Sequence, residues 1–257
     1  MKTSDLLWRI FAAACCLFMV SPLVILILFC FSDKAVISFP IEGLTTAWWA
    51  ELFSRREFWK SLGNSAIVAG TVGAATTLFG TMAAFSLARM HPRAAGVTMA
   101  LLTLPVMLPP LVLGLTLLSF FSGLEIRLGL QTVILAHLVF TQPFVILVVH
   151  ARMSRFDFAV VNSARDLGAS PLRAFTSVTL PLIRPTIIGA AMIAMALSLD
   201  DFIVTFFTIG GGNTLPTFLW GMLRKGANPQ INIVGFLLMS LTICASLIAF
   251  RVTRYRG

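Results

Sequence analysis

The sequence has 257 residues, of which 58% are hydrophobic and only 11% are charged, and its mean hydropathy is +0.94. A water-soluble core does not need so many apolar residues, and several apolar runs exceed the roughly 18 residues that predict a membrane-spanning helix. The formal net charge of +9 does not indicate nucleic-acid binding, because the basic residues flank the apolar runs instead of clustering with aromatic residues. The composition therefore predicts an all-α protein that crosses a membrane several times.

Six transmembrane helices are predicted in chain order. The first is not expected to be a cleaved signal peptide, because its apolar run is longer than the usual signal h-region. The loop at 32–64 carries three of the five tryptophans, which favours an anchor at the outer membrane interface with a short amphipathic helix. The six predicted spans are Ile10–Phe31, Ser65–Ala88, Val97–Phe121, Leu130–Ala151, Thr186–Phe207 and Ile231–Phe250.

The distribution of Lys and Arg predicts the orientation of these spans. Six spans place both termini on one side, and the side with more Lys and Arg in its short loops is cytoplasmic. The terminal side carries twelve, namely Lys2, Arg9, Arg89, Arg93, Arg152, Arg155, Arg165, Arg173, Arg184, Arg251, Arg254 and Arg256. The opposite side carries seven, namely Lys34, Arg55, Arg56, Lys60, Arg127, Arg224 and Lys225. Both termini are therefore expected in the cytoplasm.

The loop between the fourth and fifth spans contains a polar, helix-prone segment, Asn162–Pro181. Ser170 followed by Pro171 predicts the start of a helix, because Ser caps helix N-termini well and Pro fits the first turn. An earlier short helix is expected to end at Gly168, since glycine readily supplies the left-handed conformation of a helix terminus. Two short helices at an angle would form a compact cytoplasmic knob.

The second and third spans carry features that predict close packing and a break. Small residues in the second span allow another helix to approach closely, either within the chain or from a partner subunit. In the third span, Pro105, Pro109 and Pro110 lie within six residues, so the backbone hydrogen bonding must be interrupted. This indicates a cavity-lining or hinge role, or only a packing kink. Gln142, beside Pro143 in the fourth span, adds polarity at a second predicted kink or serves as an interhelical contact.

Two adjacent carboxylates, Asp200 and Asp201, lie in the fifth predicted span. Asp200 would lie roughly 20 Å along the helix from Thr186, still inside the bilayer. A carboxylate there costs on the order of 2.5–3.5 kcal/mol, so both should face a polar cavity or paired groups. A cation pathway is one interpretation; capping of a broken helix or contact with a neighbouring subunit is the other. Adjacent helical residues point about 100° apart, so the two are not expected to do the same job.

Motifs for enzymatic chemistry are missing from the sequence. There is no GxxxxGK[ST] phosphate-binding loop, and the four cysteines have neither CxxC nor Cys/His ligand spacing, so no metal site is expected. The three histidines are scattered singly and are expected to be structural or interfacial. The chain is therefore predicted to be neither an enzyme nor an ATP-binding protein.

The segment Asn162–Pro181 resembles the cytoplasmic coupling motif of the integral-membrane permeases of binding-protein-dependent ABC importers. The pattern maps onto Asn162-Ser163-Ala164, Gly168, Val178 and Leu180-Pro181, with Asn162 and Ser163 replacing the family's Glu and first Ala. The resemblance implies that this segment docks onto a separate ATPase subunit. The docking residues that it implies are Asn162, Ser163, Ala164, Arg165, Asp166, Leu167, Gly168, Ala169 and Leu172.

Further segments, including Ser198–Phe202 and Trp220–Gly226, are similar to the spermidine/putrescine subgroup of these permeases. This implies import of a polyamine or related small cation, a five-helix core at 64–257 with the coupling loop 152–185, and an N-terminal helix and external loop at 1–63. The implied partners are two ATPase subunits that hold the ATP, a second homologous permease, a periplasmic or extracellular solute-binding protein, and lipid of the bacterial inner membrane. The expected substrate pathway comprises Asp200, Asp201, Pro109 and Gln142.

Other functions remain open from the sequence. The solute could instead be an opine, another amino-acid derivative or an anion, since related permeases share much of the pattern. A stand-alone secondary carrier would use Asp200 as a proton or ion site and would need no ATPase; an inverted repeat would support it, and none is evident. A purely structural assembly protein would leave the broken third helix and the acidic pair without a role.

Overall fold

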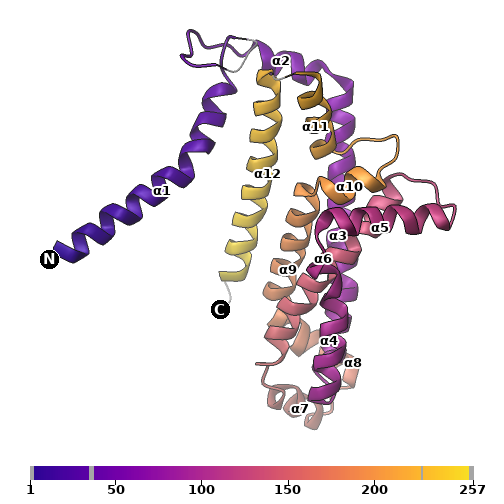
Figure 1. Ribbon diagram of the computed structural model, residues 1–257. Helices are drawn as coiled ribbons and strands as arrows, with labels where there is room; N and C mark the ends of the chain where they lie inside the picture. The colour runs from indigo at the N-terminus through magenta and orange to yellow at the C-terminus, as the bar shows by residue number, and fades with distance from the viewer. Residues whose placement is uncertain (1–2, 35–37, 227, 255–257) are drawn as a thin grey trace. The chain divides into compact units, whose positions relative to one another are not determined.

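The computed structural model describes residues 3–34, 38–226 and 228–254, which are almost entirely helical (Figure 1). Among these residues, five helices are long and apolar enough to cross a membrane, and a sixth span results if the bent pair α4 and α5 counts as one. The predicted all-α membrane fold is thus confirmed. The described residues form two compact units, one within 1–59 and 218–240 and the other within 60–217 and 241–257.

The helices begin and end where prolines, glycines and polar residues interrupt the apolar runs. In chain order they are α1 (Thr3–Phe29), α2 (Ala47–Ser54), α3 (Arg56–Leu87), α4 (Pro92–Met107), α5 (Pro110–Gly123), α6 (Leu130–Met153), α7 (Ala159–Asp166), α8 (Pro171–Ala174), the π-helical turn η1 (Phe175–Thr179), α9 (Leu180–Asp200), α10 (Ile203–Thr208), α11 (Leu215–Lys225) and α12 (Pro229–Arg254). The predicted loop at 32–64 is shorter than expected, because α3 begins at Arg56.

The first unit contains α1, α2 and the start of α12. The predicted short helix in this loop is α2, and its two tryptophans are hydrogen-bonded to residues just after the end of α1. The indole N–H of Trp48 donates to the carbonyl of Ser32 at 3.1 Å, and that of Trp49 donates to Cys30 at 3.0 Å. Trp49 also packs edge-on against Phe236 of α12, with ring centroids 6.0 Å apart. These contacts fix α2 within this unit.

The second unit is built on α3, α6 and α9. A buried apolar cluster joins the three helices through Ala84, Val145 and Ala190, among others. Glycines on α3 let the neighbouring backbones approach: a Cβ at Gly80 would lie 2.7 Å from Cγ1 of Val145 on α6, and a Cβ at Gly73 would collide with Met195 on α9. At least these two small residues therefore serve packing within the chain.

Gly80→Ala is expected to destabilise the protein by about 1–3 kcal/mol, because the added methyl group must displace Val145 in a packed interface. Gly70→Ala on the same helix is the matched control. A Cβ there has no neighbouring atom within 4 Å, so the substitution should stabilise the helix by roughly 0.5–1 kcal/mol. The midpoints of thermal unfolding in detergent test both expectations. Equal midpoints for the two variants would contradict this packing.

The predicted break in the third span is confirmed. The axes of α4 and α5 differ by 97°, and the break lies between Met107 and Pro110. Pro109 is extended, with ψ of 135°, and precedes Pro110 at the first position of α5. Because proline lacks an N–H and disfavours helix in the residue before it, consecutive prolines end one helix and start another. Beyond the break, α5 packs on α10, where a Cβ at Gly114 would lie 2.8 Å from the ring of Phe207.

The fifth span does not have the predicted limits. The helix begins at Pro171, runs through α8, η1 and α9, and ends at Asp200. The prediction that it continues to Phe207 is wrong, because the Asp201 carboxylate accepts a hydrogen bond from the backbone N–H of Thr205 at 2.8 Å and so starts the separate helix α10. In contrast, Pro143 does not divide α6, which is helical from Leu130 to Met153.

Candidate functional site

The segment predicted to dock an ATPase folds as two short helices joined by a tight turn. The helix α7 ends at Asp166, and Gly168 follows with φ of +88°, a left-handed conformation that favours glycine. Ser170 then caps α8, because its hydroxyl accepts a hydrogen bond from the N–H of Arg173 at 3.3 Å. The local structure predicted for this segment, including the cap, is therefore confirmed.

The turn presents a polar hollow beside exposed apolar side chains. The hollow has a volume of about 680 Å³, and its lining consists of Asn162, Arg165, Asp166, Gly168, Ala169, Ser170 and Pro171. Leu167 is 90% exposed and Leu172 is 73% exposed. A leucine side chain loses about 1.5–3 kcal/mol of burial energy when it is left in water. The structure thus brings most of the predicted docking residues together on one exposed surface.

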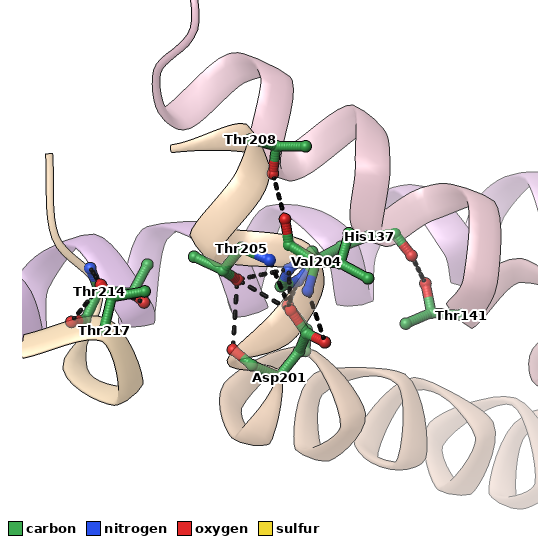
Figure 2. A network of polar contacts seen from close by, with 9 residues as sticks. His137, Thr141, Asp201, Val204, Thr205, Thr208, Thr214 and Thr217 are labelled. Atoms are coloured by element: carbon green, nitrogen blue, oxygen red, sulfur yellow. Dashed lines mark hydrogen bonds and ion pairs between the residues drawn. The ribbon is translucent and has the colours of Figure 1, made fainter. Parts of the chain in front are cut away.

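The predicted pathway residues do not form a single group. Pro109 is exposed at the bend before α5, whereas Gln142 lies on α6 beside Gly80. Asp200 is exposed at the end of α9. Asp201, the next residue, is turned into a buried network (Figure 2). Of the two adjacent carboxylates, Asp200 is therefore the exposed one.

The buried network joins α6, α9 and α10 (Figure 2). The imidazole of His137 places Nδ1 at 2.8 Å from Oγ of Ser198, and Nε2 at 2.9 Å from Oγ1 of Thr205. The same Nε2 lies 3.2 Å from Oδ2 of Asp201. Thr205 donates to that oxygen through both its backbone N–H, at 2.8 Å, and its hydroxyl, at 3.0 Å. Both ring nitrogens of His137 thus have polar partners.

Sequence reasoning missed the roles of His137 and Thr205. The helical spacing of Ser198, Asp201 and Thr205 shows that they can lie near one another, but His137 is more than sixty positions away. Nothing local to a lone histidine in an apolar run identifies its partner. The expectation that the histidines are structural or interfacial agrees with the buried position of His137, whose exposure is 1%.

A comparison with known protein families identifies the chain. The model of the family described as "Binding-protein-dependent transport system inner membrane component" matches residues 76–255. The chain belongs to this family. The matched range includes the segment Asn162–Pro181, the break after α9 and the whole buried network.

Curated relatives of this permease family cover most of the chain. The putrescine transport system permease protein PotI of Escherichia coli strain K12 is 31% identical over 241 residues, which are 91% of this chain and 85% of PotI. The spermidine/putrescine transport system permease protein PotC of Shigella flexneri is 29% identical, over 92% of this chain and 91% of PotC. The resemblance drawn from the motifs is thereby confirmed.

Solved importer structures share the fold. A chain of a bacterial ABC transporter involved in the import of the acidic polysaccharide alginate superposes with a TM-score of 0.74, at 15% identity, over 97% of this chain and 95% of that chain. A chain of the MetNI methionine ABC transporter gives a TM-score of 0.62, at 20% identity, over 79% and 95%. The protein is therefore an inner-membrane permease subunit of an ABC importer and not an enzyme; ATP hydrolysis takes place on a separate subunit.

Proposed function

We propose that this permease imports a polyamine, such as putrescine or spermidine, or a related small cation. This proposal rests on the exposed carboxylate of Asp200 at the end of α9. An ionised group is costly within a membrane-spanning segment and is therefore expected at a functional site. The printed functions of the relatives PotI and PotC agree with a cationic solute.

An anionic solute is the second candidate, because one structural neighbour imports an acidic polysaccharide. The carboxylate of Asp200 disfavours it. A solute anion about 4 Å from this carboxylate would be repelled by roughly 4 kcal/mol at an effective dielectric constant of 20. A solute ammonium group at the same distance would be attracted by a similar energy. An opine or another amino-acid derivative carries charges of both signs and remains an alternative that experiment must separate.

The exposed turn around Gly168 is proposed to dock an ATPase subunit. Leu167 and Leu172 present apolar surface, and the hollow between α7 and α8 is lined by polar residues that can pair with a partner. The proposed complex contains two ATPase subunits that bind the ATP, a second homologous permease and a solute-binding protein; this chain itself binds no cofactor. The excess of Lys and Arg on the terminal side supports a cytoplasmic location for the turn and both termini.

One continuous helical segment connects the proposed docking surface with Asp200. Residues 171–200 form 30 helical residues, which span about 45 Å at 1.5 Å per residue. ATP-driven closure of the ATPases would move the turn at Gly168, and the helical segment would carry the displacement to its far end at Asp200. Alternation between two access states follows if the ATPases bind one state more tightly than the other.

Stimulation of ATP hydrolysis tests the proposed solute. The assembled complex is reconstituted in lipid with its binding protein, which is loaded in turn with putrescine, spermidine, an amino acid or an acidic sugar. The expected result is stimulation by the polyamine-loaded protein and none by the same protein without solute. Stimulation only by the amino acid or the acidic sugar would overturn the polyamine assignment and leave the permease assignment intact.

A further inference from the structure

The hydrogen bonds at the break between α9 and α10 converge on the carboxylate of Asp201. Asp201 accepts from the backbone N–H and the hydroxyl of Thr205. Since the hydroxyl proton of Thr205 is then used, Nε2 of His137 must supply the remaining hydrogen in its contacts with Thr205 and Asp201. The other ring nitrogen, Nδ1, lies 2.8 Å from Oγ of Ser198, a hydroxyl that can donate to it. A hydrogen on Nε2 therefore satisfies the contacts of His137 with both Thr205 and Asp201.

The network holds α10 at its start. A helix of six residues is too short to be stable without a cap and tertiary contacts. The cap is Asp201, which also accepts a weak bond from the N–H of Val204 at 3.5 Å. The far end of α10 is fixed to the same helix as His137, because the hydroxyl of Thr132 donates to the carbonyl of Thr208 at 2.7 Å. Both ends of α10 are therefore bonded to α6.

The apolar contacts of α10 leave it little freedom to rotate. Val204 belongs to a buried cluster with Leu113 of α5 and Ala136 of α6. On the same surface, Phe207 lies close against Gly114 of α5. The direction in which the chain leaves α9 at Asp200 is thus determined by what α10 contacts.

We propose that His137 and Asp201 are positioning residues, which together hold the helix break so that the neighbouring Asp200 carboxylate faces the transport path. Asp201 itself does not bind the solute. Its side chain is only 12% exposed, and its oxygens already accept hydrogen bonds from α6 and α10. The proposal rests on the role given above to Asp200, and it assigns different roles to two carboxylates that are adjacent in sequence.

Substitutions at position 201 distinguish the effect of losing the helix cap from the effect of losing the negative charge. Asn and Ser cap helices about as well as Asp but carry no negative charge, whereas Ala cannot accept the hydrogen bond. With equal amounts of assembled complex, Asp201→Ala is expected to raise the KM for polyamine uptake by about tenfold, the equivalent of a lost cap. Asp201→Asn and Asp201→Ser should retain a KM near that of the wild type. A solute-binding carboxylate would instead be damaged equally by all three substitutions, which would overturn the proposal.

A labelling experiment tests the same positioning without any assumption about the solute. The four native cysteines, which are free, are replaced by serine, and Asp200→Cys is introduced into the complex in vesicles. The rate of reaction with a charged thiol reagent then reports how far position 200 faces water. His137→Gln keeps an N–H near the place of Nε2, whereas His137→Asn keeps one only near Nδ1. The rate should therefore change with His137→Asn and recover with His137→Gln.

Glu125→Cys, in the exposed loop after α5, is the control whose labelling rate should not respond to residue 137. A rate at position 200 that is the same for histidine, glutamine and asparagine at 137 would overturn the positioning role. If the wild-type complex does not transport polyamines but the labelling rates still follow residue 137, the proposed solute is wrong and the positioning role stands. The two hypotheses can therefore fail separately.

Discussion

Gly168→Asp is expected to abolish the stimulation of ATP hydrolysis by the loaded binding protein. The backbone at Gly168 has φ of +88°, and a Cβ there would have no neighbouring atom within 4 Å. Asp tolerates this left-handed conformation better than most residues, so the turn and membrane insertion should survive. The new charge, however, would lie in the hollow that Arg165 and Asp166 also line, and this added carboxylate would have to lose its water on docking. A loss of about 2 kcal/mol or more, typical of a damaged interface hot spot, lowers coupled hydrolysis at least tenfold.

Two matched variants show whether such a loss is caused by the added charge and by its position in the turn. Gly168→Asn adds a side chain of the same shape without the charge and should retain much more of the stimulation. Gly211→Asp places the same charge on an exposed glycine in the loop between α10 and α11, and it should have no effect. Unchanged coupled hydrolysis in Gly168→Asp, with a normal amount of complex in the membrane, would contradict the assignment of the turn as the docking surface.

Asp200→Asn is expected to lower the uptake of putrescine or spermidine by roughly tenfold to a hundredfold at low solute concentration. The change removes the negative charge but keeps the size of the side chain. A hydrogen bond to a charged group contributes about 1.5–3 kcal/mol, which corresponds to that range in affinity. Radiolabelled uptake into vesicles with the assembled complex measures the effect, with the amount of complex held equal.

Glu125→Gln is the control for this experiment, because it removes a charge of the same sign from an exposed position outside the membrane-spanning helices. It should leave uptake unchanged. If Asp200→Asn transports the polyamine as well as the wild type does, Asp200 is not part of a cation pathway. If both variants lose activity to the same extent, the charge acts through the overall field of the protein surface instead of through a contact.

The parts of the structure that follow from neighbouring residues could be predicted from the sequence. The break in the third span was predicted because proline removes a backbone donor wherever it occurs, and the break lies at Met107–Pro110. The turn at Gly168 and the cap at Ser170 were predicted for the same kind of reason, since φ preference and side-chain capping act within a few residues.

Tertiary structure alone decided which of the two adjacent aspartates is buried. Both carry the same charge in the same apolar run, so the sequence determined that the site is acidic but not which carboxylate is exposed. Asp201 turned inward because His137, on another helix, offers it a hydrogen-bond donor, and Asp200 remained exposed. The fifth span ends at Asp200 for the same reason, because the Asp201 carboxylate is bonded to His137 and to the backbone of Thr205. A helix break in an apolar run is stable only where distant groups satisfy its polar atoms, and the position of those groups depends on packing.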